Sequence, residues 1–242
     1  MTDLLAHTAH RPYPPPAGPW VMQQDWERLL FAHWPLPAET LRARVPPQLE
    51  LDTFDGQAWL GVVPFAMRRV YPRYTFPVPG LSDFLELNVR TYVKAGGRPG
   101  VFFFSLDAAN PLAVAIARAW YRLPYFTARM SLTVAADGWH TYASTRTHAG
   151  APPAELRARY RPAGAVCLSA PGSLEAFLTE RYCLYTVAGG EVYRGEIHHG
   201  QWPLQPAEAE FELNSMPAPH GLALPAARPL LHFVRRIETV EW

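Results

Sequence analysis

The chain has 242 residues, of which 49% are hydrophobic and 18% charged, and its formal net charge is +1. This composition is typical of a globular protein, and the small net charge gives no electrostatic reason to expect nucleic acid or a membrane surface as a partner. No apolar run is long enough to cross a bilayer and no secretory signal pattern opens the sequence, so we expect a cytoplasmic protein.

Prolines crowd residues 1–20, which include the run His-Arg-Pro-Tyr-Pro-Pro-Pro-Ala-Gly-Pro. Such a density of proline excludes a helix and favours an extended arm, lying over the body of the protein or over a partner subunit. No repeat or linker divides residues 21–242, so we expect them to form a single domain.

Turn signals and alternating side chains predict mostly strands in this domain. The predicted strands span residues 49–54, 57–65, 84–94, 100–107, 125–134, 139–147, 182–188, 191–199, 207–214 and 230–241. Asp55-Gly56, Asp137-Gly138 and Gly189-Gly190 are tight-turn signals between neighbouring strands. Short helices are predicted at 37–45, 110–121 and 173–181, the last two opening on capping residues Asn110 and Ser173. Many hairpins with few helices indicate a mostly β (α+β) fold that is mostly antiparallel and closed or nearly closed.

The strand at 84–94 carries two different faces. Since side chains alternate along a strand, Leu85, Leu87, Val89, Thr91 and Val93 share an ordinary core face. The opposite face carries Glu86, Asn88, Arg90, Tyr92 and Lys94. This polar row is either a solvated outer surface or a binding site with an acid and an arginine in register.

Residue usage limits the chemistry. Lys94 is the only lysine, so 21 of the 22 basic residues are arginines and a side-chain amine has a single candidate. Cys167 and Cys183 are far apart and form neither a zinc motif nor a redox motif. No phosphate loop, nucleotide fingerprint, zinc-protease motif or nucleophile elbow is present, so we expect no cofactor.

A metal site is conceivable at His198-His199, together with His33 and Glu86. Neighbouring residues on a strand point to opposite faces, however, and a metal needs at least three convergent ligands. We therefore expect no metal, with one of the two histidines exposed and the other hydrogen-bonded inside, next to Trp202.

Three further polar groups leave alternatives open. Glu180-Arg181-Tyr182 is either a structural pairing at a helix-to-strand junction or a source of cavity residues. Arg118 lies on the exposed stripe of its helix or is buried against a carboxylate such as Asp107. Arg146 is similarly ambiguous.

Taken together, the motifs resemble the uncharacterised YqjF-like family (domain of unknown function 2071), which is grouped with the acetoacetate decarboxylase-like superfamily. The motifs are Phe31-x-His33-Trp34, Asp55-Gly56-x-Ala58-Trp59, Glu86-x-Asn88-Val89-Arg90-Thr91-Tyr92-Val93, Pro99-Gly100-Val101-x-Phe103, Ala117-Arg118 to Leu123-Pro124-Tyr125, Glu180-Arg181-Tyr182-x-Leu184-Tyr185 and His198-x-x-x-Trp202. The resemblance covers the chain from about residue 22 onward. It implies a closed β-barrel with peripheral helices, whose internal cavity is the active site.

The superfamily's decarboxylases use a lysine that forms a Schiff base, activated by a second lysine. At the matching positions this chain has Tyr125 for the nucleophile, Phe126 for its neighbour and Ala119 for the motif's glutamate. The resemblance therefore implies that Schiff-base chemistry is absent here. Glu86 falls where those enzymes carry a cavity glutamate.

We expect a cavity that presents Glu86, Asn88, Arg90 and Tyr125, with Arg118 near its rim. A sheltered arginine favours a carboxylate or another planar anion, so the expected partner is a small anionic molecule. Two functions compete. One is the binding or sensing of a small organic acid. The other is an acid–base lyase or isomerase acting on a small oxo-acid, with Glu86 as base and Tyr125 as proton donor.

A third interpretation is a structural protein with a filled cavity, in which the proline-rich arm mediates interactions. The sequence is also compatible with a homo-oligomer.

Overall fold

A computed structural model describes residues 4–242 and contains twelve strands. The strands are β1 (Met22–Leu36), β2 (Glu50–Leu51), β3 (Ala58–Pro72), β4 (Phe84–Ala95), β5 (Arg98–Ala108), β6 (Tyr125–Val134), β7 (His140–Arg146), β8 (Glu155–Pro162), β9 (Cys183–Ala188), β10 (Glu191–His199), β11 (Gln205–Asn214) and β12 (Leu230–Glu241). The helices are α1 (Ala38–Arg42), α2 (Pro111–Trp120) and α3 (Leu174–Thr179), with 3₁₀ turns η1 (Leu4–Ala6) and η2 (Ala218–His220). The fold is mostly β with few helices, as the sequence predicts.

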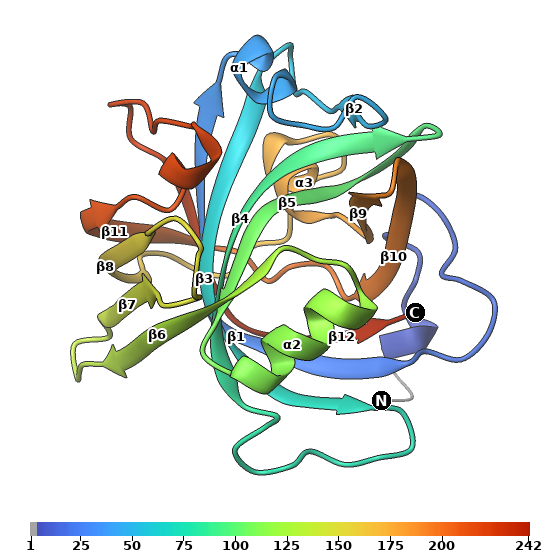
Figure 1. The fold of residues 1–242 in the computed structure, drawn as a ribbon, viewed down its shortest axis with the longest axis horizontal. Coiled ribbons are helices and arrows are strands. Elements are labelled where there is room, and N and C mark those ends of the chain that lie inside the picture. The colour runs from blue at the N-terminus through green and yellow to red at the C-terminus, as the bar shows by residue number, and fades with distance from the viewer. Residues whose placement is uncertain (1–3) are drawn as a thin grey trace.

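All twelve strands belong to one sheet, in the order β10-β9-β5-β6-β7-β8-β11-β12-β1-β3-β4-β2, with further pairings of β10 with β12 and of β5 with β4. In Figure 1, β6, β7, β8 and β11 gather on one side of the long strand β3, and β9 and β10 lie on the other. The sheet is mostly antiparallel, as the sequence predicts, and the exceptions are the parallel pairings of β5 with β6 and with β9. A parallel pairing needs a crossover connection, and α2 lies within the one between β5 and β6.

Strand β4 is covered on both faces, since residues 86–93 are all buried. Leu87 and Val89 join the larger hydrophobic cluster with Leu30, Val62 and Tyr142. A second cluster includes Phe31, Val63, Phe65, Trp202 and Val234. Consecutive residues such as Leu30 and Phe31 separate into different clusters because strand side chains alternate. The polar row on β4 is therefore an internal surface and not a solvated one.

The predicted local signals are largely present. Asn110 caps α2 by accepting hydrogen bonds from the backbone N–H groups of Leu112 and Ala113, and Ser173 caps α3 through Ala176. The hairpins β4–β5, β6–β7 and β9–β10 form as predicted. The predicted hairpin around Asp55-Gly56 is wrong, because β2 pairs with β4 and leaves only an isolated bridge across that turn. No described helix is long and apolar enough to cross a membrane.

The N-terminal arm lies on the body of the same chain, against β10. Arg11 Nη1 donates a hydrogen bond of 2.7 Å to the Ile197 carbonyl and lies 3.2 Å from His198 Nδ1. His198 Nε2 is 2.9 Å from the Leu4 carbonyl. The expectation that one of the paired histidines is exposed is therefore wrong, because the arm covers His198 while His199 packs inside against Trp202.

Candidate functional site

The candidate site is built on β4, where Glu86, Asn88, Arg90 and Tyr92 follow one another on a single face. Their exposed fractions are 3%, 4%, 9% and 0%. Alternation along the strand places them together, and packing on both sides of the sheet removes them from water. Buried polar groups are normally paired, so the partners of each decide what this surface does.

At one end of the row, Tyr125 from β6 donates a hydrogen bond of 2.9 Å to Glu86 Oε2. Burial raises the pKa of Glu86 to about 8, although the hydrogen bond from Tyr125 opposes the shift. Burial and the neighbouring Glu86 carboxyl raise the pKa of Tyr125 well above its usual value. At neutral pH this end therefore presents a protonated carboxyl and a phenol, both neutral.

A second carboxyl acts on the same region. Gln24 Nε2, from β1, donates a hydrogen bond of 2.5 Å to Glu241 Oε1 at the end of β12. Burial raises the pKa of Glu241 to about 7, and its negative charge contributes to the raised pKa of both Glu86 and Tyr125. Glu241 was not predicted as a site residue. The alternation of residues 230–241 shows which side of its own strand Glu241 occupies, but not which other strands lie on that side.

At the other end, Arg90 is nine-tenths buried and lies over aromatic rings. Its guanidinium carbon is 5.0 Å from the centroid of Phe31 and 5.9 Å from that of Tyr92. Within residues 4–242 Arg90 has no carboxylate partner, and its Nε has no hydrogen-bond partner. A cation removed from water without an anion is costly, so this arginine is unusual among buried groups.

Several neighbouring polar atoms are equally unsatisfied. Among the described residues, buried atoms without a hydrogen-bond partner include Asn88 Oδ1, His33 Nδ1, Trp26 Nε1 and Trp202 Nε1. The indoles of Trp26 and Trp202 stack with centroids 5.7 Å apart, and Trp202 also meets Phe31 edge-on. Unpaired donors and acceptors set among aromatic side chains are suited to a small polar molecule or ordered water.

Arg118 stands apart from this row. It is exposed on α2, and its Nη1 donates a hydrogen bond of 2.6 Å to the Tyr125 carbonyl. It also lines a shallow groove of about 460 Å³ together with Thr127 and His148. Arg146 donates two hydrogen bonds, of 2.8 and 2.7 Å, to the buried carboxylate of Asp107. Arg118 is therefore the exposed arginine of its helix, and Arg146 is the one buried against Asp107.

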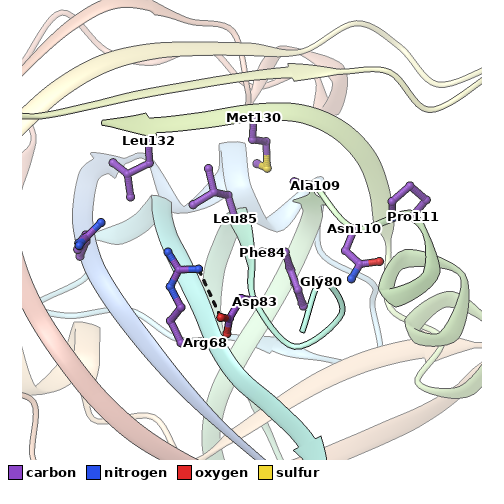
Figure 2. A pocket seen from close by; sticks show the side chains of 11 residues that line it. Arg68, Gly80, Asp83, Phe84, Leu85, Ala109, Asn110, Pro111, Met130 and Leu132 are labelled. Carbon is purple, nitrogen blue, oxygen red and sulfur yellow. Dashed lines mark ion pairs between the residues drawn. The ribbon is translucent and has the colours of Figure 1, made fainter. Parts of the chain in front are cut away.

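A second groove, of about 400 Å³, lies between the start of β4 and β6 (Figure 2). Leu85, Met130 and Leu132 form its apolar wall, and Arg68 and Asp83 are 4.0 Å apart at its side. Leu85 points away from Glu86 on the strand, so the apolar wall of this groove belongs to the face opposite the polar row.

Lys94 and the Glu180-Arg181-Tyr182 motif form structural pairs. Asp52 binds Lys94 Nζ at 2.8 Å and Arg181 Nη1 at 2.6 Å. The Tyr182 hydroxyl donates to Glu180. The only lysine thus lies at the end of β4 in an ion pair, away from Tyr125.

In the part of the chain that the structure describes, no three His, Cys, Asp or Glu side chains gather as a metal site. The four candidates have other neighbours. His33 Nε2 lies 2.6 Å from the Tyr92 hydroxyl, Glu86 accepts from Tyr125, and His198 and His199 contact backbone carbonyls.

Comparisons with known proteins agree with this architecture. The model of the family DUF2071, described as an uncharacterized conserved protein, matches residues 23–238. The chain is 44% identical to the uncharacterized protein YqjF of Bacillus subtilis (strain 168), over 94% of this chain and 93% of that protein.

Two kinds of solved structure share the fold. The enduracididine biosynthesis enzyme MppR complexed with pyruvate has a TM-score of 0.62 and 13% identity, covering 96% of this chain and 91% of that one. The acetoacetate decarboxylase of Legionella pneumophila has a TM-score of 0.57 and 18% identity, covering 96% and 90%. At these identities the likeness concerns the fold.

Proposed function

We propose a binding function for this chain, which belongs to the DUF2071 family of uncharacterized conserved proteins: it holds a small organic acid against the polar row of β4. The ligand-binding residues are Glu86, Asn88, Arg90 and Tyr125, while Arg118 belongs to the surface beside Tyr125. One observation carries the proposal. Arg90 is nine-tenths buried and has no carboxylate partner among residues 4–242.

The energetics of burial connect that observation to an acid. Leaving one charge of a buried pair without its partner costs about 3–5 kcal/mol, so a lone buried cation persists where something outside the chain compensates it. A carboxylate fits the guanidinium in shape and charge. At the other end of the row, neutral Glu86 and Tyr125 can donate hydrogen bonds to a carbonyl or hydroxyl of the same molecule.

The barrel is part of the proposal. Strand pairings lead from β4 through β5, β9, β10, β12, β1 and β3 and back to β4, which supports a closed barrel around the row. A barrel of this size can enclose one small ligand. The structural neighbour MppR is complexed with pyruvate, which supports small oxo-acids as the class to test first.

Ligand binding here does not use a Schiff base. Tyr125 occupies the position that matches the lysine of the decarboxylases, and Lys94 is held in an ion pair with Asp52. Reduction with borohydride in the presence of pyruvate leaves Lys94 unmodified if this is correct, as peptide mass analysis would reveal. A stoichiometric adduct on Lys94 contradicts it.

The alternative function is acid–base catalysis on a small oxo-acid, and the raised pKa values of the Glu86 and Glu241 carboxyls favour it. They also change the roles expected from the sequence. With a pKa of about 8, Glu86 holds its proton at neutral pH and acts as an acid, so the base is Glu241. Exchange of the C3 protons of pyruvate with deuterated water, followed by NMR, separates an enzyme of this kind from a binding protein.

The test of binding is a thermal-shift screen of small carboxylic acids, because a ligand of the folded state raises the melting temperature. Pyruvate and its neutral methyl ester form the first pair. We expect acids to stabilise the wild type but not Arg90→Met. Arg129→Met is the matched control, because Arg129 is exposed on β6, and acids should stabilise it as they do the wild type. Equal stabilisation of a folded Arg90→Met variant contradicts the proposal.

A further inference from the structure

Two residues far apart in sequence meet beside Arg90. In the sheet, His33 of β1 is paired with Gly61 of β3, and Gly61 is paired with Arg90 of β4. The three therefore form one cross-strand row on the same face. A Cβ at residue 61 would lie 3.2 Å from Arg90 Cγ and 3.2 Å from His33 Cδ2. The missing side chain of Gly61 thus lets the arginine and the histidine approach each other.

The neighbours of His33 determine which ring nitrogen carries the hydrogen. Its Nε2 lies 2.6 Å from the Tyr92 hydroxyl. The Arg90 guanidinium carbon lies 5.9 Å from the centroid of the Tyr92 ring, and a guanidinium can only donate hydrogen bonds. A cation this close favours a Tyr92 hydroxyl whose oxygen lone pairs stay free on the side of Arg90, so that the hydroxyl donates its hydrogen to His33 Nε2. In the neutral ring the remaining hydrogen is then on Nδ1.

Burial and the neighbouring groups keep the His33 ring neutral. The side chain is fully buried and stacks at 18° on Phe31. Burial and the nearby Arg90 and His232 hold the pKa of His33 well below its usual range. Its Nδ1 has no hydrogen-bond partner within residues 4–242, and neither does Arg90 Nε. Two buried nitrogens on the same face of the sheet thus lack acceptors among the described residues.

We propose that His33 and Arg90 together bind the carboxylate of the ligand, each donating to it, and that Tyr92 is the positioning residue that orients His33. This inference rests on the proposed function and adds a specificity-determining residue to it. Arg90 alone would accept any anion. With a neutral N–H donor as a second contact, the site favours a planar carboxylate, which offers one oxygen to each donor. A halide offers only one atom, and the neutral ester or amide of the same acid lacks the negative charge.

The role of Tyr92 is tested without any ligand. The nitrogen-15 chemical shifts of His33 at neutral pH distinguish a protonated Nδ1 from a protonated Nε2. We expect the Nδ1–H form in the wild type and a mixture of forms in Tyr92→Phe, which keeps the ring and removes the hydroxyl. A wild-type protein with the hydrogen on Nε2 overturns the orientation.

The role of His33 is tested by calorimetric titration with pyruvate. His33→Phe keeps an aromatic ring in place and removes the donor, so we expect binding about tenfold weaker, as for the loss of one hydrogen bond to a charged group. His33→Gln restores an N–H and should recover part of the loss. Should His33→Phe fold poorly, Gly61→Ala serves instead, because its methyl group separates the two side chains and should weaken binding in the same direction.

The outcomes separate this inference from the proposed function. Binding that disappears in Arg90→Met but is unchanged in both His33→Phe and Gly61→Ala leaves the function standing and overturns the role of His33. If no carboxylic acid of the screen binds the wild type, the proposed function fails and the carboxylate site fails with it.

Discussion

Arginine and glutamate appear in two contrasting settings in this protein. On the outer face of β8 and β11, every second residue forms a cross-strand ion pair. These pairs are Arg157–Glu212, Arg159–Glu210 and Arg161–Glu208, at 3.0, 2.7 and 2.8 Å. On the buried face of β4, Glu86 and Arg90 lie four residues apart and form no ion pair among the described residues. Paired charges are exposed where water already solvates them, and an unpaired charge is buried where none of residues 4–242 compensates it. The outer pairs therefore need no further partner, whereas the inner row is where the proposed ligand would compensate a charge.

A third setting sharpens this contrast and gives the largest expected effect. Arg146 and Asp107 are buried like Arg90 but bound to each other by two hydrogen bonds. Asp107→Ala leaves Arg146 buried without its partner, so we expect the free energy of unfolding to fall by about 3–5 kcal/mol. Urea denaturation followed by circular dichroism measures it. A loss below about 1 kcal/mol would show that burial without a partner is inexpensive here and would remove the argument for Arg90.

The next effect concerns pH and Glu86. Folding raises the pKa of this acid from 4.5 to about 8, so the folded state binds the proton more tightly than the unfolded chain. Stability then falls as the pH rises from 4.5 through about 8, by an amount of the order of a few kcal/mol. Glu86→Gln cannot ionise and should show a smaller decrease over this range, measured by urea denaturation at pH 5 and pH 8.

Glu191→Gln is the matched control, because Glu191 is exposed on β10 and its replacement should leave the pH dependence as in the wild type. An equal decrease in the free energy of unfolding between pH 5 and pH 8 for the wild type and Glu86→Gln would show that water reaches the Glu86 carboxyl. Glu241 contributes in the same direction up to its pKa of about 7, so some dependence remains in Glu86→Gln.

How much of this arrangement could be predicted depends on where its parts lie in the sequence. The polar row of β4 follows from strict alternation within residues 84–94, and its first and third members are already visible as an acid and an arginine. Whether the row is buried depends on strands that pack from elsewhere. Alternation also marks β8, where Leu156, Ala158 and Tyr160 are buried, although the sequence analysis assigns no strand there.

Strand β1 could not be predicted in the same way. It is buried on both faces, so apolar residues do not alternate with polar ones. Its pairing with β3 shifts register between Glu27 and Ala32, and Arg28 has a φ of 53° there, so the spacing of inward residues changes within the strand. His33 lies beyond this irregularity. The proximity of His33 to Arg90 depends on the register of β1 with β3 and of β3 with β4, which no local sequence pattern predicts. The motif Phe31-x-His33-Trp34 singles out His33 but does not show that Arg90 lies beside it.

A smaller effect is expected from Arg90 itself. Arg90→Met replaces an unpaired buried cation by an apolar chain of similar length, among the rings of Phe31 and Tyr92. Since no protein carboxylate loses its partner, we expect the free energy of unfolding to stay within about 1 kcal/mol of wild type or to rise. Urea denaturation of the ligand-free protein measures it. Destabilisation as large as that of Asp107→Ala would make Arg90 a structural residue.

The smallest effect should come from the exposed ion pairs between β8 and β11. Arg159 pairs with Glu210 and lies over the ring of Trp139, but both charged groups are exposed. Exposed pairs gain little because water already solvates each partner and salt screens their attraction. Arg159→Met should therefore leave the urea midpoint unchanged within the scatter of replicate measurements, and any small difference should disappear at 1 M salt. A clear loss of stability that persists at high salt would mean that the outer ion pairs hold β8 against β11, and the contrast between exposed, paired charges and a buried, unpaired one would need another explanation.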